Sequence, residues 1–197
     1  MLPLIYSDRA YTLIFGIILV IWVTSELLGP VRWQGSSTTK KQDRGSLAIA
    51  ISFSLLGLVL CFLLPFLLPS ATIAQHHPSI FLVGFVVMLL GIWWRWSAIR
   101  ALGRHFKGIV AVDPDQHIIQ HGPYKLIRHP SYSGALLIMI GIGVMIGNWA
   151  SLLTITLGLL GGLLYRISVE EAVLRSTFGQ TYVDYMQRTK RLIPFIY

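Results

Sequence analysis

The stretch "GALLIMIGIGVMIGNWASLLTITLGLLGGLLY", residues 134–165, decides the fold because it is apolar throughout yet too long for one membrane span. A helix needs about 20 apolar residues to cross the hydrocarbon core of a bilayer. The middle of the stretch reads Gly147-Asn148-Trp149, a turn signal beside an aromatic residue suited to the membrane interface. Two Gly-x-x-x-Gly pairs, at 143/147 and 158/162, favour close helix contact. The stretch therefore predicts two helices joined in a tight hairpin.

Three further apolar segments precede this hairpin, at residues 10–28, 47–68 and 80–99, and each is close to the length of one span. Of the 197 residues, 54% are hydrophobic and only 12% are charged, which is far more apolar than a water-soluble domain. We therefore expect an all-α integral membrane protein with about five transmembrane helices.

The distribution of positive charge predicts the orientation in the membrane. Of the 16 lysines and arginines, all but Arg9 lie in segments that five alternating spans would place on one side. The positive-inside rule then puts the N-terminus outside and the C-terminus in the cytoplasm. Contact with anionic lipid or an anionic ligand accounts for the net charge of +8, and the cations form no stripe typical of nucleic-acid binding. We expect no metal site, because His76-His77 has no further ligands nearby.

Residues that can support chemistry are concentrated in the second half of the chain. We divide the sequence into a transmembrane scaffold, residues 1–94, and a catalytic region, residues 95–197, that holds a cytoplasmic segment, the hairpin and amphipathic C-terminal helices. Glu26 is the only acid within a span, and we interpret it as an interfacial residue. Residues 107–120 contain the turn signal Asp113-Pro114-Asp115 and predict either irregular structure or a small hairpin.

The first cluster of candidate site residues lies in "GPYKLIRHPSYSG", residues 122–134. Pro130 suits the first position of a helix, with His129 at the cap position. The positive end of that helix, next to Arg128, would attract an anion. Tyr124 and Tyr132 offer flat surfaces on which a ring or a sulfonium can pack.

A second cluster follows the hairpin, where Arg166 and Glu170-Glu171 are about one helical turn apart. An amphipathic helix is predicted to continue to Phe178-Gly179, and a further helical turn or two carries Tyr182 and Tyr185. Because a hairpin returns the chain to the same side, both clusters should meet at the membrane surface. Ordinary membrane flanks would also carry arginine and tyrosine, but they need no His-Pro pair and no paired acid.

These motifs resemble the isoprenylcysteine carboxyl methyltransferase family, within a wider group of membrane methyltransferases that includes phospholipid N-methyltransferases. The resemblance covers roughly the C-terminal half of the chain. It rests on Gly122-Pro123-Tyr124, Arg128-His129-Pro130-Ser131-Tyr132-Ser133-Gly134, Arg166, Glu170-Glu171, Phe178-Gly179, Tyr182, Tyr185 and Pro194. It implies that S-adenosylmethionine binds between the loop before the hairpin and the helix after it.

The resemblance also implies residue roles. Cofactor contacts would come from Gln116, His117, Ile118, Tyr124, His129, Pro130, Ser131, Tyr132, Glu170 and Glu171. The family has a His-x-Leu-Val run upstream, and here Gln116 takes the place of its histidine, with His117 one position along. Arg166 would face the substrate carboxylate, with Arg128 and Glu171 as further catalytic candidates.

The implied reaction is methyl transfer to the carboxylate of a lipid-like or lipidated substrate taken from the membrane. A carboxylate is already a nucleophile, so the enzyme has mainly to align the reactants, and two arginines suit a carboxylate acceptor. Three alternatives stay open at this point. They are N-methylation of a phospholipid or another amine, an NADPH-dependent membrane reductase of the sterol type, and a membrane protein without enzymatic activity.

Overall fold

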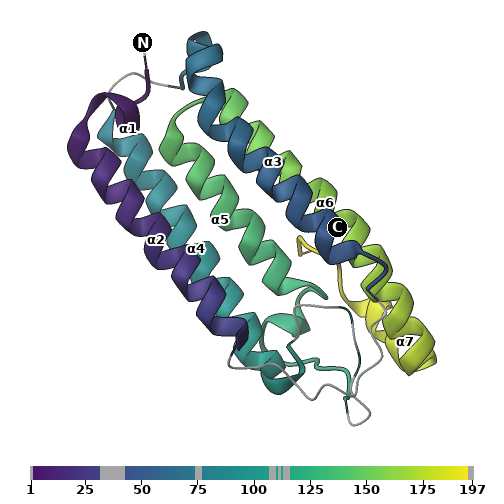
Figure 1. Ribbon diagram of the computed structural model, residues 1–197. Helices are drawn as coiled ribbons and strands as arrows, with labels where there is room; N and C mark the ends of the chain where they lie inside the picture. Colours follow the sequence, from purple (N-terminus) through teal and green to yellow (C-terminus); the bar gives the residue numbers. More distant parts are fainter. Residues whose placement is uncertain are drawn as a thin grey trace.

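The computed structural model describes residues 2–31, 43–73, 77–106, 110, 112 and 116–194, with the side chains of 27–31 left aside. Within these residues the structure is helical, with two isolated β-bridges. The elements are α1 (Leu4–Ser7), α2 (Arg9–Val31), α3 (Ser46–Leu67), η1 (Pro69–Ala71), α4 (Pro78–Leu102), η2 (Gly103–His105), η3 (Gly122–Lys125), α5 (Pro130–Ile146), α6 (Trp149–Phe178) and α7 (Gln180–Arg188). The long helices form a bundle, and η2, η3 and α7 lie together at one end of it, the site end (Figure 1).

Four of the helices, α2, α3, α4 and α6, are long and apolar enough to cross a membrane. The fifth, α5, has 17 residues and spans about 26 Å at the usual helical rise. It is therefore a little short of the hydrocarbon core, and it lies between the longer helices in Figure 1. The prediction of an all-α, multi-pass membrane protein is confirmed. The predicted segment 107–120 is described only at 110, 112 and 116–120, and His76 and the turn at 113–115 lie outside the described residues.

The predicted hairpin between α5 and α6 is present, and its turn is fixed from two sides. Gly147 adopts a left-handed backbone conformation (φ 73°), which ends α5. Asn148 then caps α6, because its side-chain oxygen accepts a hydrogen bond from the Ser151 amide at 3.1 Å. The Asn148 amide nitrogen donates to the Leu68 carbonyl at 3.0 Å, and the Ser151 hydroxyl donates to the Cys61 carbonyl at 2.7 Å. The turn is therefore anchored to the end of α3.

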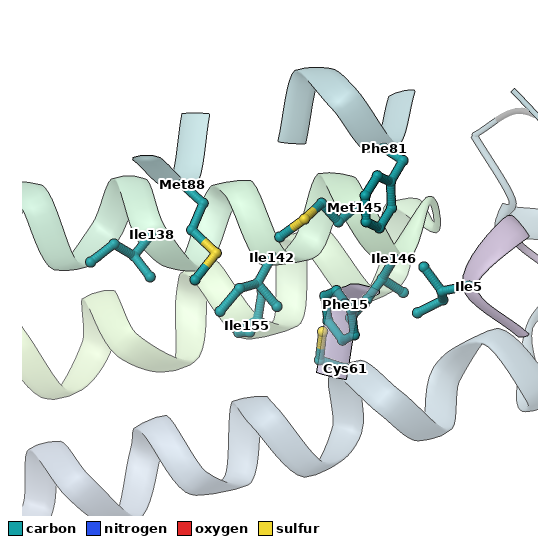
Figure 2. Close-up of a cluster of buried hydrophobic side chains, with 10 residues drawn as sticks. All are labelled: Ile5, Phe15, Cys61, Phe81, Met88, Ile138, Ile142, Met145, Ile146 and Ile155. Atoms are coloured by element: carbon teal, nitrogen blue, oxygen red, sulfur yellow. The ribbon is translucent and has the colours of Figure 1, made fainter. Parts of the chain in front are cut away.

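Glycines bring the helices into close contact. A Cβ atom added to Gly141 of α5 would lie 2.6 Å from the Met88 backbone nitrogen of α4. One added to Gly162 of α6 would lie 2.7 Å from Ala50 Cα of α3. The apolar core lies toward the end of the bundle away from α7, where the side chains in Figure 2 pack together. At the site end, a smaller apolar cluster of Val110, Val169 and Val173 lies beside polar and aromatic residues that line the cavity.

The chain after α7 returns to the start of α5 and pairs with it. Ile127 and Lys190 form a parallel β-bridge, and the Arg128 amide donates to the Lys190 carbonyl at 2.7 Å. The His129 amide donates to the Arg191 carbonyl at 3.0 Å. The segment that precedes α5 is therefore held on one side by residues near the C-terminus.

Candidate active site

A cavity opens at the site end, between the segment that precedes α5 and the end of α6 with α7. It has about 890 Å³ of empty space, part of it open to solvent. The predicted site residues that line it are Gln116, His117, Ile118, Tyr124, Arg128, His129, Ser131, Tyr132, Arg166 and Glu170. Two segments far apart in the sequence thus form one site, as the hairpin requires.

Pro130 and Glu171 are the predicted residues that do not line this cavity. Pro130 is buried at the first position of α5, and His129 stands at the cap position without a side-chain capping bond. Glu171 has no exposed surface, and its carboxylate accepts hydrogen bonds from Arg128 Nε at 3.0 Å and Arg191 Nη2 at 2.9 Å. His129 Nε2 lies 3.4 Å from the same carboxylate. The Glu171 charge is matched inside the protein, away from the cavity.

Arg128 holds several parts of the site together. Besides the contact with Glu171, its Nη1 donates to the Met186 carbonyl at 3.0 Å and to the Thr189 carbonyl. These contacts join the loop before α5 to α6 and to the end of α7. Arg128 lines the cavity, but these donors serve the protein rather than a ligand.

Arg166 and Glu170 are connected through Tyr132. Arg166 Nε donates to the Tyr132 hydroxyl at 2.9 Å, and that hydroxyl donates to Glu170 Oε2 at 2.8 Å. The arginine and the acid therefore belong to one face of α6, as their spacing predicts, with the tyrosine of α5 between them. All three side chains line the cavity, so it carries a guanidinium and a carboxylate on the same wall.

Asp43, which belongs to neither of the clusters that the sequence indicates, also binds Arg166. Arg166 Nη1 donates to Asp43 Oδ1 at 3.1 Å, and the Val110 amide donates to the same oxygen at 3.3 Å. Burial raises the pKa of the Asp43 carboxyl, but hydrogen bonds from Leu47 and Ser46, then from Val110, and the charge of Arg166 outweigh it, so the pKa is below its usual value. An acid three residues before the span that begins at Ser46, in a chain with only 8 acids, is the signal that could have found it.

Aromatic rings form much of the remaining wall. The rings of His129 and Tyr132 stack with their centroids 5.6 Å apart and their planes at 12°. Tyr124, Tyr182 and Tyr185 line the cavity as well, and the Tyr185 hydroxyl donates to the Tyr124 carbonyl at 2.7 Å. Burial raises the pKa of Tyr185 to about 12 and also raises the pKa of Tyr124 and Tyr182. These phenols are therefore uncharged at neutral pH and offer flat, neutral surfaces.

Comparison with known proteins identifies the class to which this helical bundle and its cavity belong. Residues 79–181 match the phospholipid methyltransferase family, so the protein is a multi-pass membrane methyltransferase. A probable protein-S-isoprenylcysteine O-methyltransferase from Oryza sativa subsp. indica is 33% identical over 196 residues, covering 96% of this chain and 99% of that protein. The protein-S-isoprenylcysteine O-methyltransferase of Schizosaccharomyces pombe is 36% identical over 111 residues, covering 55% of this chain and 47% of its own.

A solved structure agrees with these relatives. The eukaryotic intramembrane Ras methyltransferase, an isoprenylcysteine carboxyl methyltransferase, has a TM-score of 0.57 and 32% identity over 78% of this chain. This chain covers 53% of that longer protein. The chain belongs to the isoprenylcysteine carboxyl methyltransferase family, and the resemblance read from its motifs is confirmed. It is accordingly a membrane enzyme of the carboxyl methyltransferase class, which uses a methyl donor.

Proposed function

We propose that the enzyme transfers a methyl group from S-adenosylmethionine to the carboxylate of a lipidated substrate. The observation that carries this proposal is the pairing of Arg166 with Glu170 through Tyr132 on one cavity wall. The guanidinium suits a carboxylate acceptor, while the acid suits the positive charges of the donor. The relatives are named for isoprenylcysteine, so a prenylated cysteine with a free carboxylate is the first acceptor to test.

The residues present fit the proposed cofactor. The stacked rings of His129 and Tyr132 and the neutral phenols of Tyr124 and Tyr182 suit an adenine ring and a sulfonium, since aromatic faces attract cations. The Glu170 side chain is 30% exposed, so its carboxylate is accessible from the cavity. When bound, S-adenosylmethionine supplies an electrophilic methyl group on a positively charged sulfur.

With the methyl donor bound, the acceptor carboxylate would take the methyl group directly. A carbon–oxygen bond would form as the carbon–sulfur bond breaks with its electron pair left on sulfur, and no proton would be transferred. The contribution of this chain is therefore alignment and the exclusion of water. Arg166 would hold the carboxylate, and Tyr132 would hold Arg166 in place.

An amine acceptor fits the site less well. An ammonium group must lose a proton before it can attack, so the site would need an available base. Glu170 already accepts a hydrogen bond from Tyr132, and its Oε2 lies 3.7 Å from His129 Nδ1. The match to the phospholipid methyltransferase family nevertheless makes a phospholipid amine the second acceptor to test.

We also propose that the site end faces the cytoplasm, with the N-terminus on the opposite side. The concentration of lysine and arginine in the segments at the site end supports this orientation. Cysteine labelling at either end of the bundle in intact cells would test it.

The acceptor is tested with purified protein, labelled S-adenosylmethionine and two substrates that differ in one group. One is a prenylated cysteine with a free carboxylate, and the control is its carboxamide. We expect label only in the first product, and we expect base to release it, as it does from a methyl ester. A base-stable product, or equal labelling of the carboxamide, would overturn the carboxylate assignment.

A further inference from the structure

An ion pair at the site end lies outside the cavity and has no part in the mechanism described above. Arg95 of α4 donates from Nε to Glu26 Oε1 at 2.7 Å and from Nη2 to Glu26 Oε2 at 2.8 Å. The Arg95 and Glu26 side chains are only 16% and 21% exposed. They connect α4 to α2, although the two residues are 69 positions apart in the sequence. Both residues belong to helices with the character of membrane spans, where ionisable side chains are costly and call for an explanation.

The same arginine reaches the first turn of α5. Arg95 Nη1 donates to the Ser131 carbonyl at 3.0 Å. At this crossing the helices are in close contact, because a Cβ atom added to Gly134 would lie 2.6 Å from Arg95 Cβ. Arg95 therefore uses one end of its guanidinium to bind Glu26 and the other to fix the backbone of α5.

That backbone carries one wall of the cavity. Ser131 lines the cavity itself, and it stands between His129, with its stacked ring, and Tyr132, which holds Arg166 and Glu170. A shift of the first turn of α5 would move these groups together. A fixed carboxylate on α2 prevents the arginine from turning toward water, since both hydrogen bonds to Glu26 constrain the plane of the guanidinium.

We propose that Glu26 and Arg95 are positioning residues for methyl transfer, which act by fixing the first turn of α5 through the Ser131 carbonyl. The inference rests on the proposed function of the cavity. It gives Glu26, which the sequence indicates as an interfacial residue, a specific partner in Arg95. It also gives the first span, α2, a role in the geometry of the site.

The test compares three variants in detergent. Glu26→Gln removes the charge that orients Arg95. The double variant Glu26→Arg with Arg95→Glu restores an ion pair of reversed polarity, but a glutamate at position 95 cannot donate to the Ser131 carbonyl. Asp8→Asn is the matched control, because Asp8 is an acid that accepts a hydrogen bond from Ala10 at the other end of α2. Each protein is assayed for thermal unfolding, for the Kd of S-adenosylmethionine and for kcat and KM.

We expect Glu26→Gln to raise the Kd of the cofactor and lower kcat by about fivefold or more, the size of a weakened charge-assisted hydrogen bond. Its unfolding temperature should fall only slightly, since a glutamine at position 26 still offers Arg95 an oxygen that accepts a hydrogen bond. In the reversed pair the unfolding temperature should also be close to that of the wild type, while the Kd of S-adenosylmethionine should remain above the wild-type value. Asp8→Asn should change none of these values.

Two results would overturn the inference. One is a folded Glu26→Gln protein with unchanged Kd and kcat. The other is a reversed pair that recovers affinity together with stability, because the pair would then be purely structural. If the reversed pair does not fold, the Kd and kcat of the folded Glu26→Gln protein alone decide whether the ion pair positions the site. Failure of the proposed function is separate, since it would appear as a wild-type protein that neither binds S-adenosylmethionine nor methylates a carboxylate.

Discussion

Arg166 Nε donates a hydrogen bond to the Tyr132 hydroxyl at 2.9 Å, and this contact joins the two halves of the hairpin at the point where they form the cavity. The Tyr132 hydroxyl in turn donates a hydrogen bond to Glu170 Oε2 at 2.8 Å, so both of its hydrogen-bond partners fix its orientation. The arginine is only 6% exposed, and its geometry is set by the protein before any ligand binds. Preorganisation of this kind reduces the cost of orienting an acceptor.

Removal of the Tyr132 hydroxyl should therefore impair turnover more than binding of the cofactor. Tyr132→Phe keeps the ring that stacks on His129 but loses the hydrogen bonds to Arg166 and Glu170. We expect kcat to fall about tenfold or more, the usual cost of leaving buried polar groups unpaired, while the Kd of S-adenosylmethionine changes little. A Tyr132→Phe enzyme with unchanged kcat would show that the hydroxyl does not position Arg166.

The adjacent acids of α6 should give opposite results when each is changed to its amide. Glu171→Gln leaves Arg128 and Arg191 without their buried counter-charge, and we expect a loss of about 3 kcal/mol or more in the free energy of unfolding. Glu170→Gln should leave stability nearly unchanged and weaken cofactor binding. Denaturant unfolding and calorimetric titration measure the two effects. A stable Glu171→Gln protein with weakened cofactor binding would contradict the assignment of Glu171 to stability and of Glu170 to the cofactor.

Asp43 should make stability depend on pH on the acid side. Its pKa in the folded protein is below the usual value, so its ion pair stabilises the fold above the pKa of the unfolded chain, about 4. That stabilisation is lost as the pH falls through the lower, folded-state pKa. Unfolding temperatures of wild type and Asp43→Asn should differ above about pH 5 and converge at lower pH. A difference that stays constant down to about pH 3 would exclude this role.

The close contact of α4 with α5 can be tested at one glycine. Gly141→Ala would place a methyl group 2.6 Å from the Met88 backbone nitrogen, and we expect a loss of about 1–3 kcal/mol as the helices separate. Gly16→Ala is the control, because nothing lies within 4 Å of the added atom on α2. That change should stabilise its helix by up to about 1 kcal/mol. Equal unfolding temperatures for the two variants would show that the helices can shift without cost.

Much of the fold can be predicted from local patterns. The length of the apolar stretch and the turn signal at Asn148 are enough to predict the hairpin, and Pro130 is enough to predict where α5 begins. The hairpin in turn predicts that Arg128 and Arg166 lie at the same end. Each of these inferences depends only on residues close together in the sequence, where helix geometry and membrane thickness set the rules.

The pairings of charged residues could not be predicted in this way. Asp43 with Arg166 and Glu26 with Arg95 join residues 123 and 69 positions apart, so their contact depends on how whole helices pack. The different surroundings of Glu170 and Glu171 could not be predicted from the sequence either. Neighbours on a helix point about 100° apart, and it is the contacts of Glu171 with Arg128 and Arg191 that show that it faces the interior.

The most direct test of the central claim is the separation of cofactor binding from methyl transfer in Arg166→Ala. We measure the Kd of S-adenosylmethionine by calorimetry and the transfer of label to a prenylated cysteine on the same preparation. If Arg166 holds the acceptor carboxylate, transfer should fall by about a thousandfold or more while the Kd changes less than about threefold. Equal losses of binding and transfer, or transfer that survives the substitution, would contradict the account.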